Sequence, residues 1–348
     1  MLFRRTGTAA AAAALTLLLT PAPARAAQPC ESAPPKASVS HTQPYEVQLY
    51  DPARLATIAT GAGVRVAVID SGVDADHPQL RGHVAAGADF LRKDSDGRQD
   101  CVGHGTEVAS IITAREAAGV PFRGLAPATT IVPVRISEQE VIGDKTVGDP
   151  ASPADFARAI GWAADPARGN AQVINISLVM IEDDPQVRAA VADAIAAGVV
   201  IVAAVGNEGK PGQANPTPYP AAYPGVIGVG AVGENGQRAD FSQHGDYVDI
   251  MAAGDTVTVA ARQAGHTTAQ GTSFATPFVA ATAALLRQRF PTLTPAQLQR
   301  RLIATADPAP GGRHSPEYGY GLLNPYRALT ETLAAADAPA PPPAVVHT

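Results

Sequence analysis

Residues 271–286 read GTSFATPFVAATAALL and carry the strongest helix signal of the 348-residue chain. The small and apolar residues after Pro277 predict a helix that is buried on all sides. We expect Pro277 in the first turn, where its missing N–H has no intrahelical partner to lose. Two roles are then open to Ser273. It caps the helix, as serine often does, or it is a nucleophile at a helix end that favours negative charge.

Apolar runs that predict buried strands alternate with helical patterns upstream of this stretch. The predicted strands are residues 64–69, 130–136, 173–177, 199–204, 226–232 and 247–251, and the predicted helices are 153–164, 185–197 and a final one from 294 to 303. Such alternation is typical of a mostly parallel sheet with helices on both faces, so we predict a doubly wound α/β fold. Sites in these folds lie at the carboxyl ends of strands, and Asp70 and Asn207 each follow a predicted strand.

The first 26 residues predict export. Arg4 and Arg5 precede an apolar run at residues 9–19, and residues 24–26 (Ala-Arg-Ala) suit a cleavage position. The run is too short to span a bilayer, so we interpret it as the signal peptide of a secreted or cell-envelope protein. Its removal takes away three arginines and no acid, so the net charge changes from −6 to −9. An acidic chain disfavours nucleic acid as a partner, but not a polypeptide.

The rest of the chain divides into three parts by composition. Residues 27–60 are rich in proline and polar groups, and we expect an extended N-terminal segment. Residues 61–333 hold the predicted strands and helices and form the folded domain. Residues 334–348 are mostly alanine and proline, which predicts an unfolded tail.

Cys30 and Cys101 are the only cysteines of the chain. A pair in an oxidising compartment predicts one disulfide, which would tie down the N-terminal segment. Closing a loop of 71 residues would stabilise the fold by roughly 4 kcal/mol in the chain-entropy model. Two free thiols are the alternative.

Four polar residues at the ends of predicted elements suggest one mechanism when they are taken together. Asp70 ends a strand, and His104 begins a helix. Asn207 lies in a glycine-rich loop, and Ser273 begins another helix. Serine is a poor nucleophile unless a base such as histidine accepts its proton, and a carboxylate fixes the tautomer of that histidine. A side-chain amide can then donate to the oxyanion. Each residue alone also fits an ordinary turn or cap.

Four segments resemble the signature blocks of the subtilisin-like serine proteases, and they occur in the family order. They are VAVIDSGVD at residues 66–74, GHGTEVA at 103–109, AVGNEG at 204–209 and GTSFATP at 271–277. The resemblance covers residues 64–329 and implies a subtilisin-like fold. It implies that Asp70, His104 and Ser273 form a catalytic triad. It also implies that Asn207 and the Ser273 backbone N–H hold the oxyanion, in a serine endopeptidase that works through an acyl-enzyme.

Residues 175–180, NISLVM, resemble the strand that pairs with substrate in this family. The resemblance assigns substrate binding to Ser177, Leu178, Val179 and Gly206. The family usually has glycine where Val179 stands, so a β-branched side chain there would narrow the first specificity pocket. We therefore predict cleavage of a restricted set of peptide bonds.

The N-terminal region is most similar to that of one subgroup, the mycosins of type VII secretion. Residues 27–60 are too few for the folded inhibitory propeptide that most subtilisin-like enzymes carry. Mycosins instead have an N-terminal extension that is disulfide-bonded just before the catalytic histidine, an arrangement that Cys30 and Cys101 match. The polar loop at residues 137–152 is also mycosin-like. The resemblance implies a polypeptide substrate and type VII secretion components as partners. Mycosins usually end in a transmembrane helix, whereas we expect none in the mature chain.

No metal-ligand motif occurs in the sequence, and we expect that no cofactor is required. Calcium is common among subtilisin-like enzymes, but no motif places its ligands, so the metal sites are unknown. Asp94, Asp96 and Asp100 predict a solvated acidic loop rather than a site.

Other functions stay open beside the mycosin-like protease. One is a general extracellular subtilisin-like protease. Another is a scaffold of a secretion complex in which proteolysis is secondary. An esterase of the α/β-hydrolase type is disfavoured, because its nucleophile elbow needs glycine where Ala275 stands and its catalytic residues follow a different order.

Overall fold

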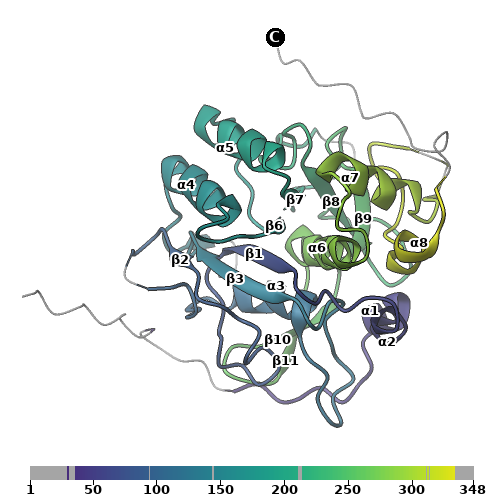
Figure 1. Ribbon diagram of the computed structural model, residues 1–348, viewed down its shortest axis with the longest axis horizontal. Helices are drawn as coiled ribbons and strands as arrows, with labels where there is room; N and C mark the ends of the chain where they lie inside the picture. The colour runs from purple at the N-terminus through teal and green to yellow at the C-terminus, as the bar shows by residue number, and fades with distance from the viewer. Residues whose placement is uncertain are drawn as a thin grey trace, which may run out of the picture.

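A seven-stranded sheet lies at the centre of the computed structural model (Figure 1). The strand order is β2-β3-β1-β6-β7-β8-β9, and every neighbouring pair is parallel. The strands are β1 (Arg65–Asp70), β2 (Ala88–Asp89), β3 (Thr130–Arg135), β6 (Val173–Ile176), β7 (Val200–Ala204), β8 (Ile227–Val232) and β9 (Ile250–Ala253).

The structure describes residue 30 and residues 36–93, 95–142, 145–210, 214–310, 312 and 314–333. The predicted signal peptide and the predicted alanine- and proline-rich tail lie outside these residues. The assignment of both segments therefore stays a prediction.

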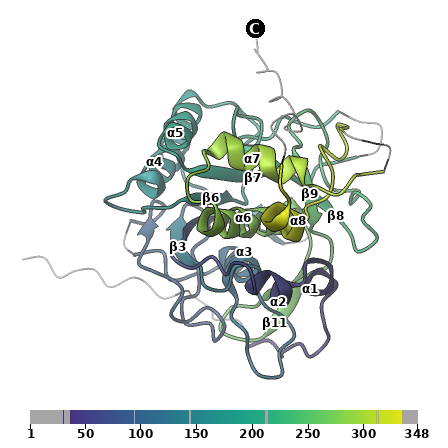
Figure 2. The same ribbon diagram turned by 45° about the vertical axis from the view of Figure 1, so that its right-hand side comes forward.

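Helices cover both faces of the sheet (Figure 1), and the turned view separates the two layers (Figure 2). One face carries α3 (His104–Thr113) and α6 (Thr272–Arg289), and the other carries α4 (Pro153–Ala164) and α5 (Pro185–Ala196). The predicted doubly wound α/β fold is confirmed.

The residues of β1 show how the sheet holds two cores. Val66 and Val68 belong to the apolar cluster that contains α3 and α6, whereas Ala67 and Ile69 belong to the cluster that contains α4 and α5. Side chains of a strand alternate between the two faces of a sheet. Because both faces are buried, the strand is apolar at every position rather than at every second one.

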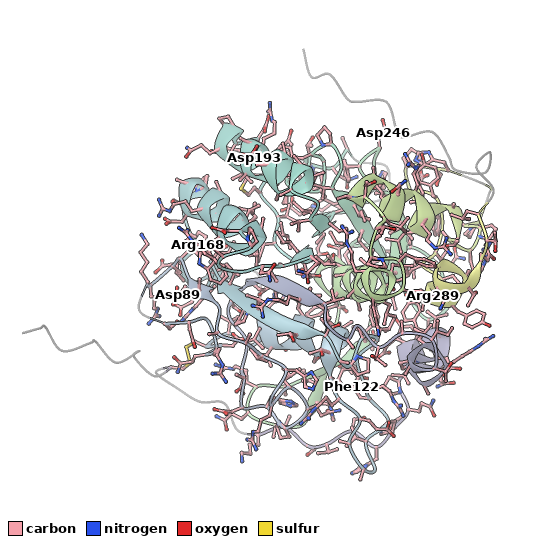
Figure 3. All side chains as sticks on the ribbon, in the orientation of Figure 1. Asp89, Phe122, Arg168, Asp193, Asp246 and Arg289 are labelled. Carbon is pink, nitrogen blue, oxygen red and sulfur yellow. A yellow bond between two sulfur atoms is a disulfide. The ribbon has the colours of Figure 1, made fainter. Side chains whose placement is uncertain are left out.

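Helix α6 is buried from residue 272 to residue 286 except at Ser273. Its alanines and threonines are small enough to let the helix lie close to the sheet, and they leave Ser273 as the one side chain of this stretch that reaches solvent. Charged side chains such as Arg168 and Asp193 lie at the surface of the molecule (Figure 3). Buried charged groups are therefore exceptions, and each needs a partner.

Two of the predicted elements need correction near the C-terminal end of the fold. The helix predicted at 294–303 is α7 (Pro295–Ala304), which Thr294 begins with a capping box, but it is not the final helix because α8 (Pro325–Thr330) follows. Six residues are too few to show a helical period. The strand predicted at 247–251 begins only at Ile250, because a turn closed by the Val248 N–H and the Gly245 carbonyl precedes it.

The N-terminal segment contains two short helices, so the prediction that it is extended throughout was wrong. They are α1 (Tyr45–Tyr50) and α2 (Pro52–Ala56). Helices of this length are unstable alone, so tertiary contacts must hold them. The Tyr50 hydroxyl accepts a hydrogen bond from the Ala253 N–H at 2.8 Å, and its ring lies 4.9 Å from the ring of Phe278 in α6.

Two antiparallel ribbons lie outside the main sheet. β4 (Glu140–Ile142) and β5 (Lys145–Val147) form within the loop predicted at 137–152. β10 (Val257–Ala260) and β11 (His266–Ala269) form a hairpin that precedes α6. The extended start of the N-terminal segment runs beside this hairpin. The Ala37 N–H donates to the Ala264 carbonyl at 3.1 Å, and the His266 N–H donates to the Ser38 carbonyl at 3.0 Å.

Glu46 joins α1 to the same hairpin through a buried carboxylate. The side chain is 1% exposed, and Oε1 accepts a hydrogen bond from the Thr258 N–H at 2.9 Å. Its second oxygen has no hydrogen-bond partner among the described residues. Loss of hydration on burial raises the pKa of Glu46 from 4.5 to about 7, against the smaller opposing effect of these hydrogen bonds.

Glu46→Gln should make the protein more stable at neutral pH. The pKa is higher in the folded state, so Glu46 favours folding below about pH 4.5, and this contribution is lost as the pH rises toward 7. The substituted amide keeps an acceptor for the Thr258 N–H and carries no charge. We expect the fall in unfolding free energy between these pH values to shrink by about 3 kcal/mol in denaturant titrations. The exposed Glu234→Gln is the control. An equally steep fall in the Glu46→Gln variant would contradict the assignment.

Candidate active site

A buried Asp70 and a partly exposed His104 form a pair at the carboxyl end of β1. Asp70 is the last residue of β1, and His104 is the first residue of α3. His104 Nδ1 donates to Asp70 Oδ1 at 2.7 Å, and the two side chains are 25% and 1% exposed. A carboxylate only accepts, so Nδ1 carries a proton, and in the neutral ring the Nε2 lone pair is free. Burial alone would lower the pKa of His104, but the Asp70 carboxylate outweighs it and raises the pKa from 6.5 to about 9.

Asp100 organises the loop that leads into His104, so the prediction that it is solvated was wrong. Asp96 is exposed as predicted, and Asp94 lies outside the described residues. Asp100 is 5% exposed. Its carboxylate accepts five hydrogen bonds, from Ser71 Oγ, the N–H groups of Val102, Gly103 and Thr106, and Thr106 Oγ1. Aspartate often accepts from backbone N–H groups before a helix, but the sequence does not show which acid of this loop is turned inward to do so.

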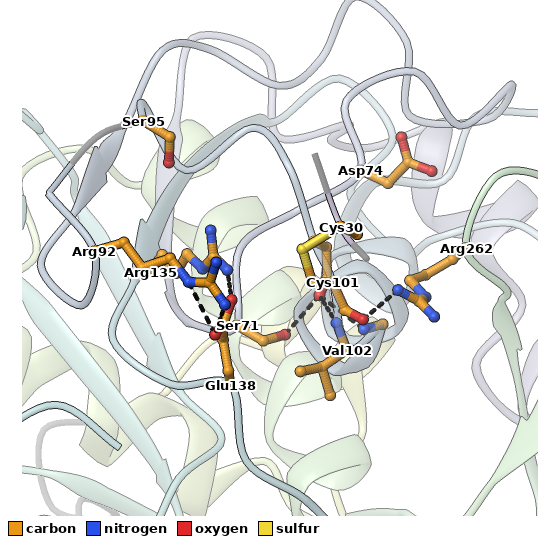
Figure 4. Close-up of a disulfide and its surroundings, with 12 residues drawn as sticks. Cys30, Ser71, Asp74, Arg92, Ser95, Cys101, Val102, Arg135, Glu138 and Arg262 are labelled. Carbon is orange, nitrogen blue, oxygen red and sulfur yellow. Dashed lines mark hydrogen bonds and ion pairs between the residues drawn. A yellow bond between two sulfur atoms is a disulfide. The ribbon is translucent and has the colours of Figure 1, made fainter. Parts of the chain in front are cut away.

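The predicted disulfide between Cys30 and Cys101 is confirmed (Figure 4). The sulfurs are 2.11 Å apart and the Cα atoms 5.3 Å apart, which excludes the alternative of two free thiols. The bond joins the N-terminal segment to the loop before His104. On the other side of this loop, the guanidinium of Arg262 donates to the Cys101 carbonyl (Figure 4).

Ser273 does not cap α6, although capping was one of its two predicted roles. The helix begins at Thr272 with Gly271 as the N-cap, and this N-cap residue makes no side-chain capping bond. Ser273 Oγ instead donates to the carbonyl of Ser177 at 2.9 Å. A hydroxyl has one proton, so Ser273 Oγ must rotate away from Ser177 before it can donate to His104. Phe274, the next residue of α6, packs against α3, because its ring lies 5.3 Å from the ring of His104.

Pro277 lies inside α6 rather than in its first turn, and this explains a second contact of Ser273. In an α-helix each N–H donates to the carbonyl four residues earlier, so proline at 277 leaves the Ser273 carbonyl without its helical partner. Ser177 Oγ donates to this carbonyl at 2.8 Å, and Asn175 Nδ2 donates to Ser177 Oγ at 3.0 Å. Ser177 and Ser273 thus exchange two hydrogen bonds, which we call the serine clamp.

Asn207 lies beside the start of α6 with its amide group oriented by Thr272. The N–H and Oγ1 of Thr272 donate to Asn207 Oδ1 at 2.8 and 2.9 Å. The carbonyl oxygen is thereby occupied, so the exposed Nδ2 remains a donor. A Cβ at Gly271 would lie 3.2 Å from Nδ2, which places this donor against the first turn of α6.

Gly206 must be glycine at its position. Its φ is +95°, and a Cβ would approach the Gln243 side chain to 2.1 Å. The Gly206 N–H donates to Thr272 Oγ1 at 3.1 Å, so Gly206 connects the loop after β7 to α6.

One groove of about 650 Å³ brings together all eight residues predicted for catalysis and substrate binding. These are Asp70, His104, Ser177, Leu178, Val179, Gly206, Asn207 and Ser273. The groove is also lined by residues that the sequence did not indicate, among them Ser137, Gln139, residues 267–269 of β11 and the following Gln270. Among the described residues, its lining contains Glu107 and Glu208 but no lysine or arginine.

The comparison with known families identifies the family of the chain. The sequence pattern of the subtilase family matches residues 61–321. The chain belongs to the subtilase family. The predicted resemblance to the subtilisin-like serine proteases is confirmed, and the protein is a subtilisin-like serine peptidase.

This subtilase is similar to both subtilisins and mycosins. It is 37% identical to subtilisin E of Bacillus subtilis over 282 residues, covering 81% of this chain and 70% of subtilisin E. It is 37% identical to Mycosin-1 of Mycobacterium tuberculosis over 340 residues, covering 83% of this chain and 75% of Mycosin-1. The crystal structure of MycP1 from Mycobacterium smegmatis superposes with a TM-score of 0.73 and 30% identity, covering 90% of this chain and 92% of MycP1. Fervidolysin from Fervidobacterium pennivorans gives a TM-score of 0.69 and 32% identity, covering 81% of this chain and 44% of fervidolysin.

Two searches of the described residues bear on metals and membranes. No three histidine, cysteine, aspartate or glutamate side chains in this part of the subtilase lie together as a metal site would need. Within the same residues, no helix has the length and apolar character to cross a bilayer. The expectation on cofactors stays a prediction.

Cys30→Ser with Cys101→Ser should lower the stability of the subtilase but spare its activity. We expect a loss of up to about 4 kcal/mol in unfolding free energy, because the 71-residue loop is no longer closed. The five hydrogen bonds of Asp100 still hold the loop before His104, so kcat/KM per titrated site should change less than threefold. Asp100→Asn is the matched variant that keeps the disulfide. We expect Asp100→Asn to lower kcat/KM at least tenfold. A larger loss of kcat/KM in the double cysteine variant than in Asp100→Asn would show that the disulfide holds His104.

Ser177→Ala should slow the enzyme by loosening the serine clamp. The change leaves the Ser273 carbonyl without a donor, which costs about 1–3 kcal/mol in a buried site. We expect a roughly tenfold lower kcat and a lower melting temperature. Pro277→Ala in the same chain restores an N–H four residues after Ser273, so the double variant should recover much of the lost stability. A double-mutant cycle in melting temperature measures this coupling, and strictly additive effects would refute it.

Proposed function

We propose that this subtilase is an exported serine endopeptidase whose catalytic triad is Asp70, His104 and Ser273. The observation that carries the proposal is the 2.7 Å pair of Asp70 and His104, in one groove with Ser273 as the only unburied residue of the first part of α6. In its neutral form His104 supplies a base with a free Nε2, and α6 supplies the Ser273 hydroxyl to the same groove.

Peptide hydrolysis then follows from these groups and one water. Ser273 Oγ forms a bond to the scissile carbonyl carbon while His104 Nε2 takes its proton. The C–N bond breaks, and His104 gives that proton to the leaving amine, which leaves an acyl-enzyme on Ser273. Water attacks the acyl carbon, His104 accepts the proton of the water, and Ser273 leaves with it. Asp70 stays ionised and stabilises the imidazolium.

Asn207 and the Ser273 backbone N–H are the proposed oxyanion donors. Thr272 fixes the amide of Asn207 through two hydrogen bonds, so Nδ2 needs no reorientation when negative charge develops. The Ser273 N–H is in the first turn of α6, where helical N–H groups have no intrahelical partner and favour an anion.

The mycosin-like role is supported by the N-terminal region. The Cys30–Cys101 disulfide ties this region down just before His104, and the chain is similar to Mycosin-1 and to MycP1. A further solved MycP1 is described as coming from the ESX-1 type VII secretion system. We infer that this protein is exported, processes polypeptides, and works with type VII secretion components.

Val179 is the residue that we propose restricts the cleavage site. Its side chain lines the groove and is 37% exposed, so it takes up space beside the serine clamp. Val179→Gly should therefore broaden the set of peptide bonds that a peptide library shows to be cut.

A fluorophosphonate probe tests the proposed nucleophile. Ser273 should form a covalent adduct at neutral to alkaline pH, and Ser273→Ala should form none. Ser71→Ala is not a suitable control because Ser71 supports the Asp100 loop, so the exposed Ser38→Ala serves instead. No Ser273-dependent adduct in the folded protein would count against the proposed function.

His104 should titrate well above the ordinary histidine pKa of 6.5, because the Asp70 carboxylate raises its pKa to about 9. Only the neutral imidazole accepts a proton, so kcat/KM should rise with pH through this range. In Asp70→Asn the charge is gone while burial still lowers the pKa, so the midpoint should move to lower pH and the rate should fall. Titration of the His104 ring by NMR measures both midpoints. An unchanged midpoint in Asp70→Asn would refute the pairing.

A further inference from the structure

The segment at residues 177–181 follows β6, lines the groove at Ser177, Leu178, Val179 and Ile181, and bends at Ile181. Met180 pairs with Tyr219 in an antiparallel bridge, and each N–H donates to the other carbonyl at 2.8 Å. In such a pair both backbone groups of one residue face its partner, so those of its neighbours face the opposite way. The N–H and carbonyl groups of Val179 and Ile181 therefore point away from Tyr219. Neither residue has a backbone hydrogen bond within the described residues.

The serine clamp sets the register of a substrate on this edge. The Ser177 carbonyl oxygen lies 2.9 Å from Ser273 Oγ, the atom that attacks the scissile carbonyl in the proposed function. The substrate residue that carries the scissile carbonyl therefore has its own N–H close to the Ser177 oxygen. Counting upstream from the scissile bond, we call this residue the first upstream residue. Strand pairing advances by two residues, which places the third upstream residue opposite Val179 and the fifth opposite Ile181.

Val179 and Ile181 form an apolar ledge along this register. They are 37% and 65% exposed, and both line the groove. The other large hydrophobic side chains of comparable exposure in the described residues are Val39 and Leu49, and neither lines the groove. Directly opposite residues of an antiparallel pair have Cβ atoms about 4.5–5.5 Å apart on the same face. An apolar side chain at the fifth upstream position would therefore cover Ile181 and remove apolar surface from water.

We propose that Ile181 is a specificity-determining residue that recognises an apolar side chain at the fifth upstream position of an extended polypeptide. The proposal rests on the proposed function, because Ser273 defines the register. It also gives the substrate class. The substrate is an unfolded segment with at least five residues before the cut, since a shorter peptide does not reach Ile181.

Three quenched fluorescent peptides with one cleavage site test this proposal. The first has leucine at the fifth upstream position, the second has serine there, and the third ends after the fourth upstream residue. We expect the wild-type kcat/KM for the leucine peptide to exceed that for the serine peptide five- to tenfold. Ile181→Ser should reduce this ratio to below twofold and leave the truncated peptide unaffected. Ile181→Val should keep an intermediate ratio, and Leu49→Ser should behave as wild type.

Three outcomes would overturn the proposal. One is an equal loss for all three peptides in Ile181→Ser, which would indicate a structural role. Another is an unchanged preference for leucine in Ile181→Ser. The third is a dependence on residues after the scissile bond, which would mean that the substrate runs in the other direction along the edge.

A binding measurement keeps the test separate from catalysis. Ser273→Ala and Ser273→Ala with Ile181→Ser are titrated with the leucine and serine peptides by fluorescence anisotropy. We expect the leucine peptide to bind Ser273→Ala at least fivefold more tightly than the serine peptide, and the double variant to bind both alike. Loss of fluorophosphonate labelling with this binding preference intact would refute the proposed function alone. Labelling without the preference would refute the role of Ile181 alone.

Discussion

The hydrogen bond from Ser177 Oγ to the Ser273 carbonyl is the contact on which the groove depends. It exists because Pro277 cannot donate to that carbonyl, so the helix needs a donor from outside itself. Ser177 supplies the donor from the end of β6, and Asn175 holds the Ser177 hydroxyl in place. Pro277 thereby leads to a hydrogen bond between α6 and the end of β6, and this bond lies at the turn that exposes the Ser273 hydroxyl.

The order of the sheet explains why the other groups meet at the same point. β1, β6 and β7 are neighbours, and the chain segments that leave their carboxyl ends carry Asp70, Ser177 and Asn207. Parallel strands bring such segments to a common edge. α3 and α6 both pack against the same face of the sheet, and His104 and Ser273 lie in their first turns at this edge. The chemistry is therefore assembled from contacts between neighbouring elements rather than from one long loop.

Much of this was predictable from sequence, because strands buried on both faces are apolar at every position and the polar residues at their ends stand out. Asp70, His104, Asn207 and Ser273 were identified in this way and by resemblance. Asp100 was not, since its burial depends on N–H groups that only the folded loop turns inward. α1 was missed because distant contacts such as that of Tyr50 with Ala253 hold it, and six residues have no helical signal of their own.

The Ser177 carbonyl has two candidate donors, and their competition relates the resting state to substrate recognition. In the free protein the donor is Ser273 Oγ, and in the register above it is the N–H of the first upstream residue. When the substrate N–H replaces Ser273 Oγ on the Ser177 carbonyl, one hydrogen bond is exchanged for another, so the net change in binding free energy is small. The exchange can free the Ser273 hydroxyl to turn toward His104, but it adds little to substrate affinity. Affinity must then come from surface that only the substrate covers. The exposed apolar side chains of Val179 and Ile181 offer such surface. The segment that positions the nucleophile through Ser177 therefore also selects the peptide through Val179 and Ile181.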